Sequence, residues 1–203
     1  KMVLHLPPIQ TTSSLLEKLA CICYSDFHTL TNQKQSDITN IFYSIKCNKV
    51  ENQKITYSGE PSFVLYFTDI PTTPEFTVYD CMNMYVQPTI ISDANITKTT
   101  MFWSLPKILV LCLPRHNRTS VCKIDAELNL SKYIIGYNKE MYQYSLFAIC
   151  NHHGNQRCGH YNAFVKSIQD GKWYYCDDDT ITPVVQLTSK DIRNAYLLFY
   201  SRV

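Results

Sequence analysis

The chain has 203 residues, of which 45% are hydrophobic and 18% are charged, so it is long enough to bury a core of its own. Its formal net charge is only +2 and no basic run is present, which argues against nucleic-acid binding. No signal-peptide pattern opens the chain, and its longest apolar run, residues 108–113, is too short to span a membrane.

Cysteine is frequent but forms no disulfide framework. There are nine cysteines, an odd number, and their spacing is not that of a small secreted domain. We therefore predict free thiols in a reducing compartment, the cytoplasm. Glycosylation sequons at Asn95, Asn117 and Asn129 are then chance matches.

The first element predicted in chain order is a helix over residues 11–30. Leu16, Leu19 and Cys23 belong to an apolar stripe at helical spacing, and threonine and serine residues before the stripe are suitable caps. The polar residues 31–37 predict a loop after this helix.

From residue 41 onward the pattern changes to strands. Short apolar or alternating segments predict strands at residues 41–45, 54–57, 62–68, 107–113, 142–151, 161–168, 172–177 and 195–201. We expect a short helix at residues 77–87, an exposed polar segment at 88–100, and a loop with a short helix at 184–193. The predicted fold class is α+β, a helical lobe followed by an antiparallel β body.

The pattern that carries most chemistry lies near the C-terminus. His160 follows a glycine at the start of an apolar strand, and Asp177 ends the next strand. Two adjacent strands joined by a short turn would place the imidazole beside the carboxylate. This is the base and the orienting acid of a nucleophilic triad, so we predict catalytic roles for both residues. The structural alternatives are an ordinary sheet histidine and an ordinary turn aspartate.

These segments resemble the ubiquitin-specific proteases, in the papain-like cysteine protease group. The His box is Gly-His-Tyr-Asn-Ala-Phe-Val at residues 159–165, and the Asp box is Gly-Lys-Trp-Tyr-Tyr-Cys-Asp-Asp at residues 171–178. Further segments resemble, in the family's order, the helix before the fingers, the LP…LKRF strand, the strand before the His box and the closing strand, at residues 76–87, 105–116, 144–154 and 194–200.

This resemblance implies a papain-like fold in a single catalytic-type domain over residues 1–203, with a reduced helical thumb at residues 1–40. An antiparallel β palm and fingers would occupy residues 41–203. It also implies a monomeric thiol peptidase that removes ubiquitin or a ubiquitin-like modifier by a Cys-His-Asp mechanism, without a cofactor. A compact viral papain-like protease of the nidovirus type would explain the short thumb, and such an enzyme could also cut a polyprotein.

The family's Cys box has no clean match in this sequence. Cys23, followed by an aromatic residue, is the nucleophile that the resemblance implies, and Cys21 is a weaker candidate. Lys18 stands where the family has an oxyanion-hole asparagine. If residues 11–30 instead correspond to a later thumb helix, Cys23 is a core thiol and the Cys box would lie before Lys1. The chain would then be an inactive ubiquitin-binding module or a fragment lacking the Cys box.

The resemblance also implies substrate contacts around the histidine and the aspartate. Gly159 would give backbone access. Tyr161 and Trp173 would line a narrow channel that selects glycine residues, and Asp178 would orient the site or polarise the oxyanion region. The family's fingers often bind zinc through two Cys-x-x-Cys pairs, but Cys47 stands alone, so we predict no metal site from local motifs.

Overall fold

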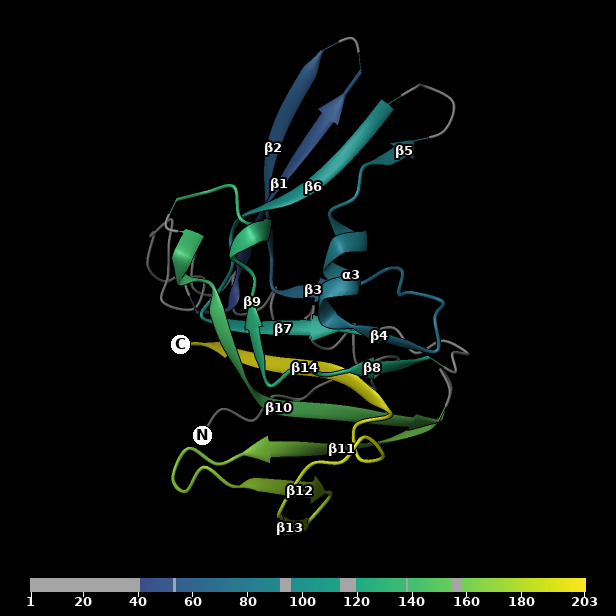
Figure 1. The fold of residues 1–203 in the computed structure, drawn as a ribbon, viewed down its shortest axis with the longest axis vertical. Helices are drawn as coiled ribbons and strands as arrows, with labels where there is room; N and C mark the ends of the chain where they lie inside the picture. The colour runs from purple at the N-terminus through teal and green to yellow at the C-terminus, as the bar shows by residue number, and fades with distance from the viewer. Residues whose placement is uncertain (1–40, 53, 92–95, 114–119, 138, 155–157) are drawn as a thin grey trace, which may run out of the picture.

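The computed structural model describes residues 41–203 except 53, 92–95, 114–119, 138 and 155–157 (Figure 1). The predicted helix at residues 11–30, with the candidate nucleophiles Cys21 and Cys23, lies outside the described residues. Within the described part, no helix combines the length and the hydropathy that crossing a membrane requires.

The fingers are a four-stranded antiparallel sheet at the top of Figure 1, in the order β2-β1-β6-β5. The strands of this sheet are β1 (Ser44–Glu51), β2 (Ile55–Ser62), β5 (Thr89–Ile91) and β6 (Ile96–Ser104). Side chains of β2 are exposed along nearly the whole strand, so this sheet adds little to the apolar core.

The palm is an eight-stranded sheet in the order β13-β12-β11-β10-β14-β7-β3, with β9 paired to β10. Its strands are β3 (Val64–Tyr66), β7 (Ile108–Cys112), β9 (Glu127–Asn129), β10 (Gln143–Gly154), β11 (Gly159–Lys166), β12 (Trp173–Asp177), β13 (Thr180–Val184) and β14 (Ala195–Arg202). All of these pairings are antiparallel except that of β3 with β7. This confirms the predicted antiparallel β body.

The remaining elements are short. Strands β4 (Glu75–Thr77) and β8 (Val121–Lys123) form a small parallel pair, and two 3-10 helices cover Ser131–Tyr133 and Lys139–Met141. Helix α3 (Val78–Tyr85) lies between the fingers and the palm (Figure 1).

Helix α3 begins where the sequence predicts a helix. A capping box starts it: the Thr77 side chain accepts from the Asp80 backbone N–H, and the Asp80 carboxylate accepts from the Thr77 backbone N–H. The buried side chains of the helix join the main core. Together with the sheets, this helix confirms the α+β class.

The core lies on the palm sheet and buries side chains of its central strands. Leu111 of β7 and Leu198 of β14 are fully buried. Tyr144 and Tyr200 are buried too, and their hydroxyls donate to backbone carbonyls of Pro106 and Asp125 at 2.6 and 2.8 Å. Strand β10 therefore has a fixed position, and β11 and β12 are built outward from it.

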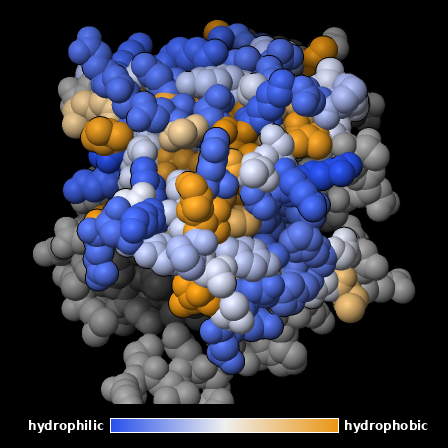
Figure 2. Space-filling view, turned by 60° about the horizontal axis from the view of Figure 1, so that its bottom comes forward, coloured by the Kyte–Doolittle hydropathy of each residue, from blue (hydrophilic) through white to orange (hydrophobic). Residues whose placement is uncertain are grey.

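The far end of the palm is mostly polar. Figure 2, seen from that end, shows hydrophobic side chains gathered near the middle of a largely hydrophilic face. The fully exposed Ile168 and Val185 and the largely exposed Ile181 belong to the turns and the edge strand around β12. Burial therefore decreases from β14 towards β13.

Four local features differ from the predictions. Residues 41–42 are helical, so β1 begins later than expected. Residues 88–91 are exposed as predicted, but the segment 88–100 also holds β5 and the start of β6. These strands were not predicted because polar fingers strands lack the alternation of a half-buried strand. Edge strand β13 was missed since it contains a proline, which edge strands tolerate. Residues 185–194 form turns without a helix.

Candidate active site

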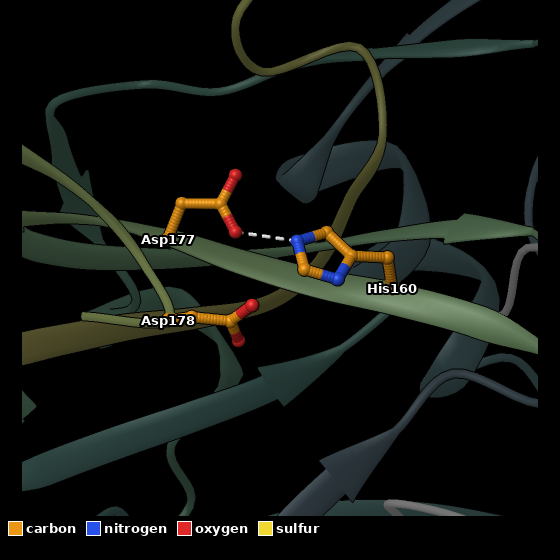
Figure 3. Close-up of side chains that lie close together, drawn as sticks. All are labelled: His160, Asp177 and Asp178. Carbon is orange, nitrogen blue, oxygen red and sulfur yellow. Dashed lines mark hydrogen bonds and ion pairs between the residues drawn. The ribbon is translucent and has the colours of Figure 1, made fainter. Parts of the chain in front are cut away.

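The site lies on the hairpin formed by β11 and β12. The two strands are antiparallel, with Ala163 opposite Cys176. Side chains alternate between the two faces of a strand, so His160 of β11 and Asp177 of β12 lie on one face, diagonally across the pair. The structure thus brings together the two side chains that the sequence predicts as base and acid (Figure 3).

Both carboxylate oxygens of Asp177 are hydrogen-bonded. Nε2 of His160 bonds to Oδ1, as the dashed line in Figure 3 marks. The Tyr175 hydroxyl donates to Oδ2 at 2.8 Å. Asp177 is therefore fixed from two sides, and Nδ1 is the ring nitrogen of His160 that remains available to a nucleophile.

These contacts favour the charged form of each partner. The hydrogen bond from the Tyr175 hydroxyl, followed by that from His160, holds the pKa of Asp177 below its ordinary value of 3.8. The hydrogen bond to Asp177 raises the pKa of His160 above its ordinary value of 6.5. An imidazolium paired with a carboxylate is the state that stabilises a neighbouring thiolate.

Tyr175 is a site residue that the sequence analysis missed. Its hydroxyl reaches Asp177 because residues two apart in a strand share a face. Its ring also packs on Phe164, with the centroids 5.1 Å apart. The signal that could have found it is a tyrosine two positions before Asp177 in the same strand.

Asp178 lies in the two-residue turn between β12 and β13. Asp177 pairs with Thr180 across this turn, and Asp178 has φ of 48°. Aspartate tolerates this left-handed conformation better than most residues, which suits a tight hairpin turn. The turn holds the Asp178 carboxylate beside the dyad (Figure 3).

His160, Asp177 and Asp178 offer ligand atoms that all lie within 4.8 Å of one another. Such a set could take a divalent cation, but Nε2 of His160 is already bonded to Asp177. Asp178 is exposed, and exposed acidic groups commonly gather without a metal ion.

Close packing against His152 leaves no room for a side chain at Gly159. A Cβ at this position would lie 2.1 Å from Nε2 of His152, so a side chain would collide with that ring. His152 in turn stacks on Tyr161, with ring centroids 4.5 Å apart. The glycine allows β10 and β11 to approach closely just before His160.

The other predicted contact residues lie at different places on the hairpin. Tyr161 is on the opposite face of β11 from His160, against His152 and Tyr196. Trp173 is at the other end of β12 from Asp177, half-buried and packed on the main core. Their roles in binding substrate stay predictions.

No cysteine that the structure describes joins the cluster of His160, Asp177 and Asp178. Burial raises the pKa of the Cys112 and Cys150 thiols to about 11, so these are poor nucleophiles. Cys158 is exposed and precedes Gly159 in the chain. The described part of the chain therefore holds the two side chains that the sequence predicts as base and acid, without a cysteine beside them.

The chain is similar to a family of known proteins. A family model described as ubiquitin carboxyl-terminal hydrolase matches residues 10–200. The chain is 39% identical over 132 residues to ubiquitin carboxyl-terminal hydrolase 10 of Arabidopsis thaliana, covering 60% of this chain and 14% of that protein. It is 36% identical over 148 residues to ubiquitin carboxyl-terminal hydrolase 4 of Mus musculus, covering 67% and 14%. The chain thus spans about a seventh of these curated relatives.

Among solved structures, the fold is similar to a chain of the SAGA Ubp8/Sgf11/Sus1/Sgf73 DUB module. The TM-score is 0.65 at 22% sequence identity, over 88% of this chain and 42% of that one. At this identity the likeness shows a shared fold.

Proposed function

The chain belongs to the ubiquitin carboxyl-terminal hydrolase family, and from this premise we propose that it is a cysteine peptidase that removes ubiquitin or a ubiquitin-like modifier from conjugates. The observation that carries the proposal is the pair of His160 and Asp177, oriented by Tyr175 at the end of the palm. A histidine fixed by a carboxylate is the general base that activates a thiol.

The proposed reaction has two steps. Nδ1 of His160 takes the thiol proton, and the thiolate attacks the carbonyl carbon of the modifier's C-terminal glycine. The C–N bond breaks, the amine leaves with the proton from His160, and a thioester forms. Water then hydrolyses the thioester with His160 again as base, which frees the carboxylate and the thiol. Asp177 stabilises the imidazolium in both steps.

Cys23 is the nucleophile that we propose. Asp178, beside the dyad, is proposed to orient the site, and Gly159, Tyr161 and Trp173 to contact the modifier's tail. We further propose that the chain acts as one catalytic-type domain, as a monomer, in the cytoplasm. No disulfide joins two cysteines that the structure describes, which suits a reducing compartment.

The test is labelling with ubiquitin that carries an electrophile at its C-terminus, followed by mass spectrometry of the modified peptide. We expect an adduct on Cys23 that is lost in Cys23→Ala and retained in the matched control Cys21→Ala. His160→Ala should slow labelling by about a hundredfold or more, because general base catalysis is removed. An adduct on another cysteine would support the peptidase activity but reject Cys23 as the nucleophile.

A second candidate is a ubiquitin-binding module without peptidase activity. It is favoured by one observation on the sequence: Lys18 stands where the family has an oxyanion-hole asparagine before Cys23. Binding to unmodified ubiquitin with no adduct on any cysteine would support the module and reject the enzyme.

A further inference from the structure

A second histidine lies directly opposite the catalytic one. His153 of β10 pairs with His160 of β11, so the two side chains share a face of the sheet. The His153 ring is held on both sides. Its Nε2 lies 3.0 Å from Nδ2 of Asn162 in β11, and its Nδ1 lies 3.0 Å from Nδ2 of Asn194, just before β14.

The orientation of these amides is determined by a backbone carbonyl. Nδ2 of the buried Asn151 lies 2.9 Å from the carbonyl oxygen of Asp191 and 3.0 Å from Oδ1 of Asn162. A carbonyl oxygen only accepts, so Asn151 must present its NH2 group there. Oδ1 of Asn162 accepts the other N–H, which leaves the Asn162 NH2 group to face His153.

The protonation of His153 follows from this chain of donors. Since Asn162 donates to Nε2, that ring nitrogen must carry a lone pair. A neutral ring cannot accept hydrogen bonds at both nitrogens, so its proton is on Nδ1. The Asn194 amide must then be flipped, so that Oδ1 and not Nδ2 faces Nδ1.

We propose that His153 is a positioning residue for the dyad, held as the neutral Nδ1–H tautomer by the amide chain of Asn151, Asn162 and Asn194. Its meaning for catalysis rests on the proposed peptidase function. When the thiol gives its proton to His160, a cation forms directly across from His153. A second cation at that place would oppose it, so a neutral ring preserves the ion pair.

The charged groups around His153 come from β10, β11, β12 and the turn before β14. His160 faces it from β11, and Asp177 of β12, which is bonded to His160, also interacts with His153 electrostatically. The Asp191 carboxylate, in the turn before β14, accepts from Thr188 at 2.6 and 2.8 Å. His152, the neighbour in β10, stacks on Tyr161 at the opposite face. No described carboxylate makes a hydrogen bond or ion pair to His153 that would favour an imidazolium.

The amide chain also ties together three segments of the palm. Asn151 belongs to β10, Asn162 to β11, and Asp191 and Asn194 to the turn before β14. The backbone N–H of His152 adds a bond to the carbonyl of Asn194 at 3.0 Å. These hydrogen bonds therefore hold β11, the strand that carries His160, against β10 and the turn before β14. The side chains that make them are far apart in the sequence.

The direct test is the 15N spectrum of the histidine rings in the labelled chain. We expect an unprotonated Nε2 and a protonated Nδ1 for His153 at neutral pH. In Asn162→Asp a carboxylate, which only accepts, faces Nε2, so Nε2 should become protonated while the His152 signals stay in place as an internal control. An Nε2–H or doubly protonated His153 in the parent, or an unchanged tautomer in Asn162→Asp, would overturn the proposal.

A fixed charge tests the consequence for the dyad. His153→Arg should lower the pKa of His160, measured by NMR, and reduce kcat/KM by about tenfold, because a like charge disfavours the imidazolium. Ile168→Arg, with the same charge at the other end of β11, is the matched control. An equal pKa of His160 in the two variants would overturn the positioning role. The NMR spectra need neither a nucleophile nor a substrate. A chain without peptidase activity would therefore reject the proposed function, while the spectra would still decide the protonation of His153.

Discussion

The fingers and the palm are stabilised by different interactions. In the fingers, β2 is exposed almost throughout, and the buried residues of β1 are the polar Ser44 and Asn48. In the palm, β14 buries Leu198 and Tyr200 completely. The palm is therefore stabilised by apolar burial, and the fingers by strand pairing and polar side chains.

A polar cluster of Lys46, Asn48, Glu60 and Thr100 joins the three main strands of the fingers. Asn48 donates to Glu60 at 3.0 Å and accepts from Thr100 at 2.9 Å, and Lys46 bonds to Glu60 at 2.8 Å. The hydrogen bond from Lys46, followed by that from Asn48, lowers the pKa of Glu60. This cluster aligns β1 with β2 and β6 where few apolar contacts do so.

The dyad lies at the end of the palm where burial fades. Along one face of β11, Phe164 and Asn162 are buried and His160 is exposed. Changes at the dyad should therefore alter titration and catalysis more than stability, which separates the site from the core beneath it.

The largest effect should come from removing core volume in the palm. Leu198→Ala leaves a cavity in a fully buried position and should reduce the free energy of unfolding by about 2–5 kcal/mol. Urea unfolding of the chain measures this. The matched fingers variant Ile90→Ala, at a residue that is 73% exposed, should change it by less than about 0.5 kcal/mol. Equal losses would abolish the distinction between the two regions.

Breaking the polar cluster should open the fingers alone. Asn48→Leu removes the hydrogen bonds to Glu60 and Thr100 and should destabilise the fingers by about 1–3 kcal/mol. Hydrogen exchange should accelerate in β1, β2 and β6 while β14 stays protected. Lys49→Gln, which breaks only an exposed ion pair with Glu51, is the control and should have almost no effect. Faster exchange in the palm would contradict local opening.

Much of the palm could be predicted because its signals are local. Residues 107–113 form a continuous apolar run that predicts a buried strand, and the hydrogen-bonded pair Thr77 and Asp80 marks the start of α3. The proximity of His160 and Asp177 followed from two strands and a short turn, which is the simplest antiparallel connection.

The fingers and the amide chain could not be predicted for a different reason. Strands β5 and β6 have no period of two because neither face is fully buried. The position of His153 opposite His160 depends on the register of β10 with β11, and a slip of one residue would put His152 there instead. Register is a tertiary property, so two adjacent histidines could not be distinguished by sequence.

Titration of the dyad should separate site from core. Asp177→Asn should lower the pKa of His160 towards its ordinary value, as NMR can measure, because the hydrogen-bonded carboxylate is lost. A raised histidine pKa stabilises the fold below 6.5 and this gain is lost as pH rises through the folded value. A lowered carboxyl pKa stabilises above 3.8 and is lost as pH falls. The free energy of unfolding of the parent should therefore exceed that of the variant by the largest amount between pH 3.8 and pH 6.5. A constant difference at all pH values would contradict an ion pair.

The smallest effect should come from Tyr175→Phe, which keeps the ring packed on Phe164 and removes only the hydroxyl. Asp177 then loses the contact that contributes most to its low pKa, so that pKa should rise while His160 still holds Oδ1. We expect labelling by the ubiquitin electrophile to slow by about twofold to tenfold, the scale of one hydrogen bond. The free energy of unfolding should fall only slightly, since the phenylalanine ring stays packed on Phe164. Tyr174→Phe, whose hydroxyl contacts Asp170 instead, is the matched control. Equal labelling rates for the two variants would mean that the bond from Tyr175 has no part in orienting the dyad.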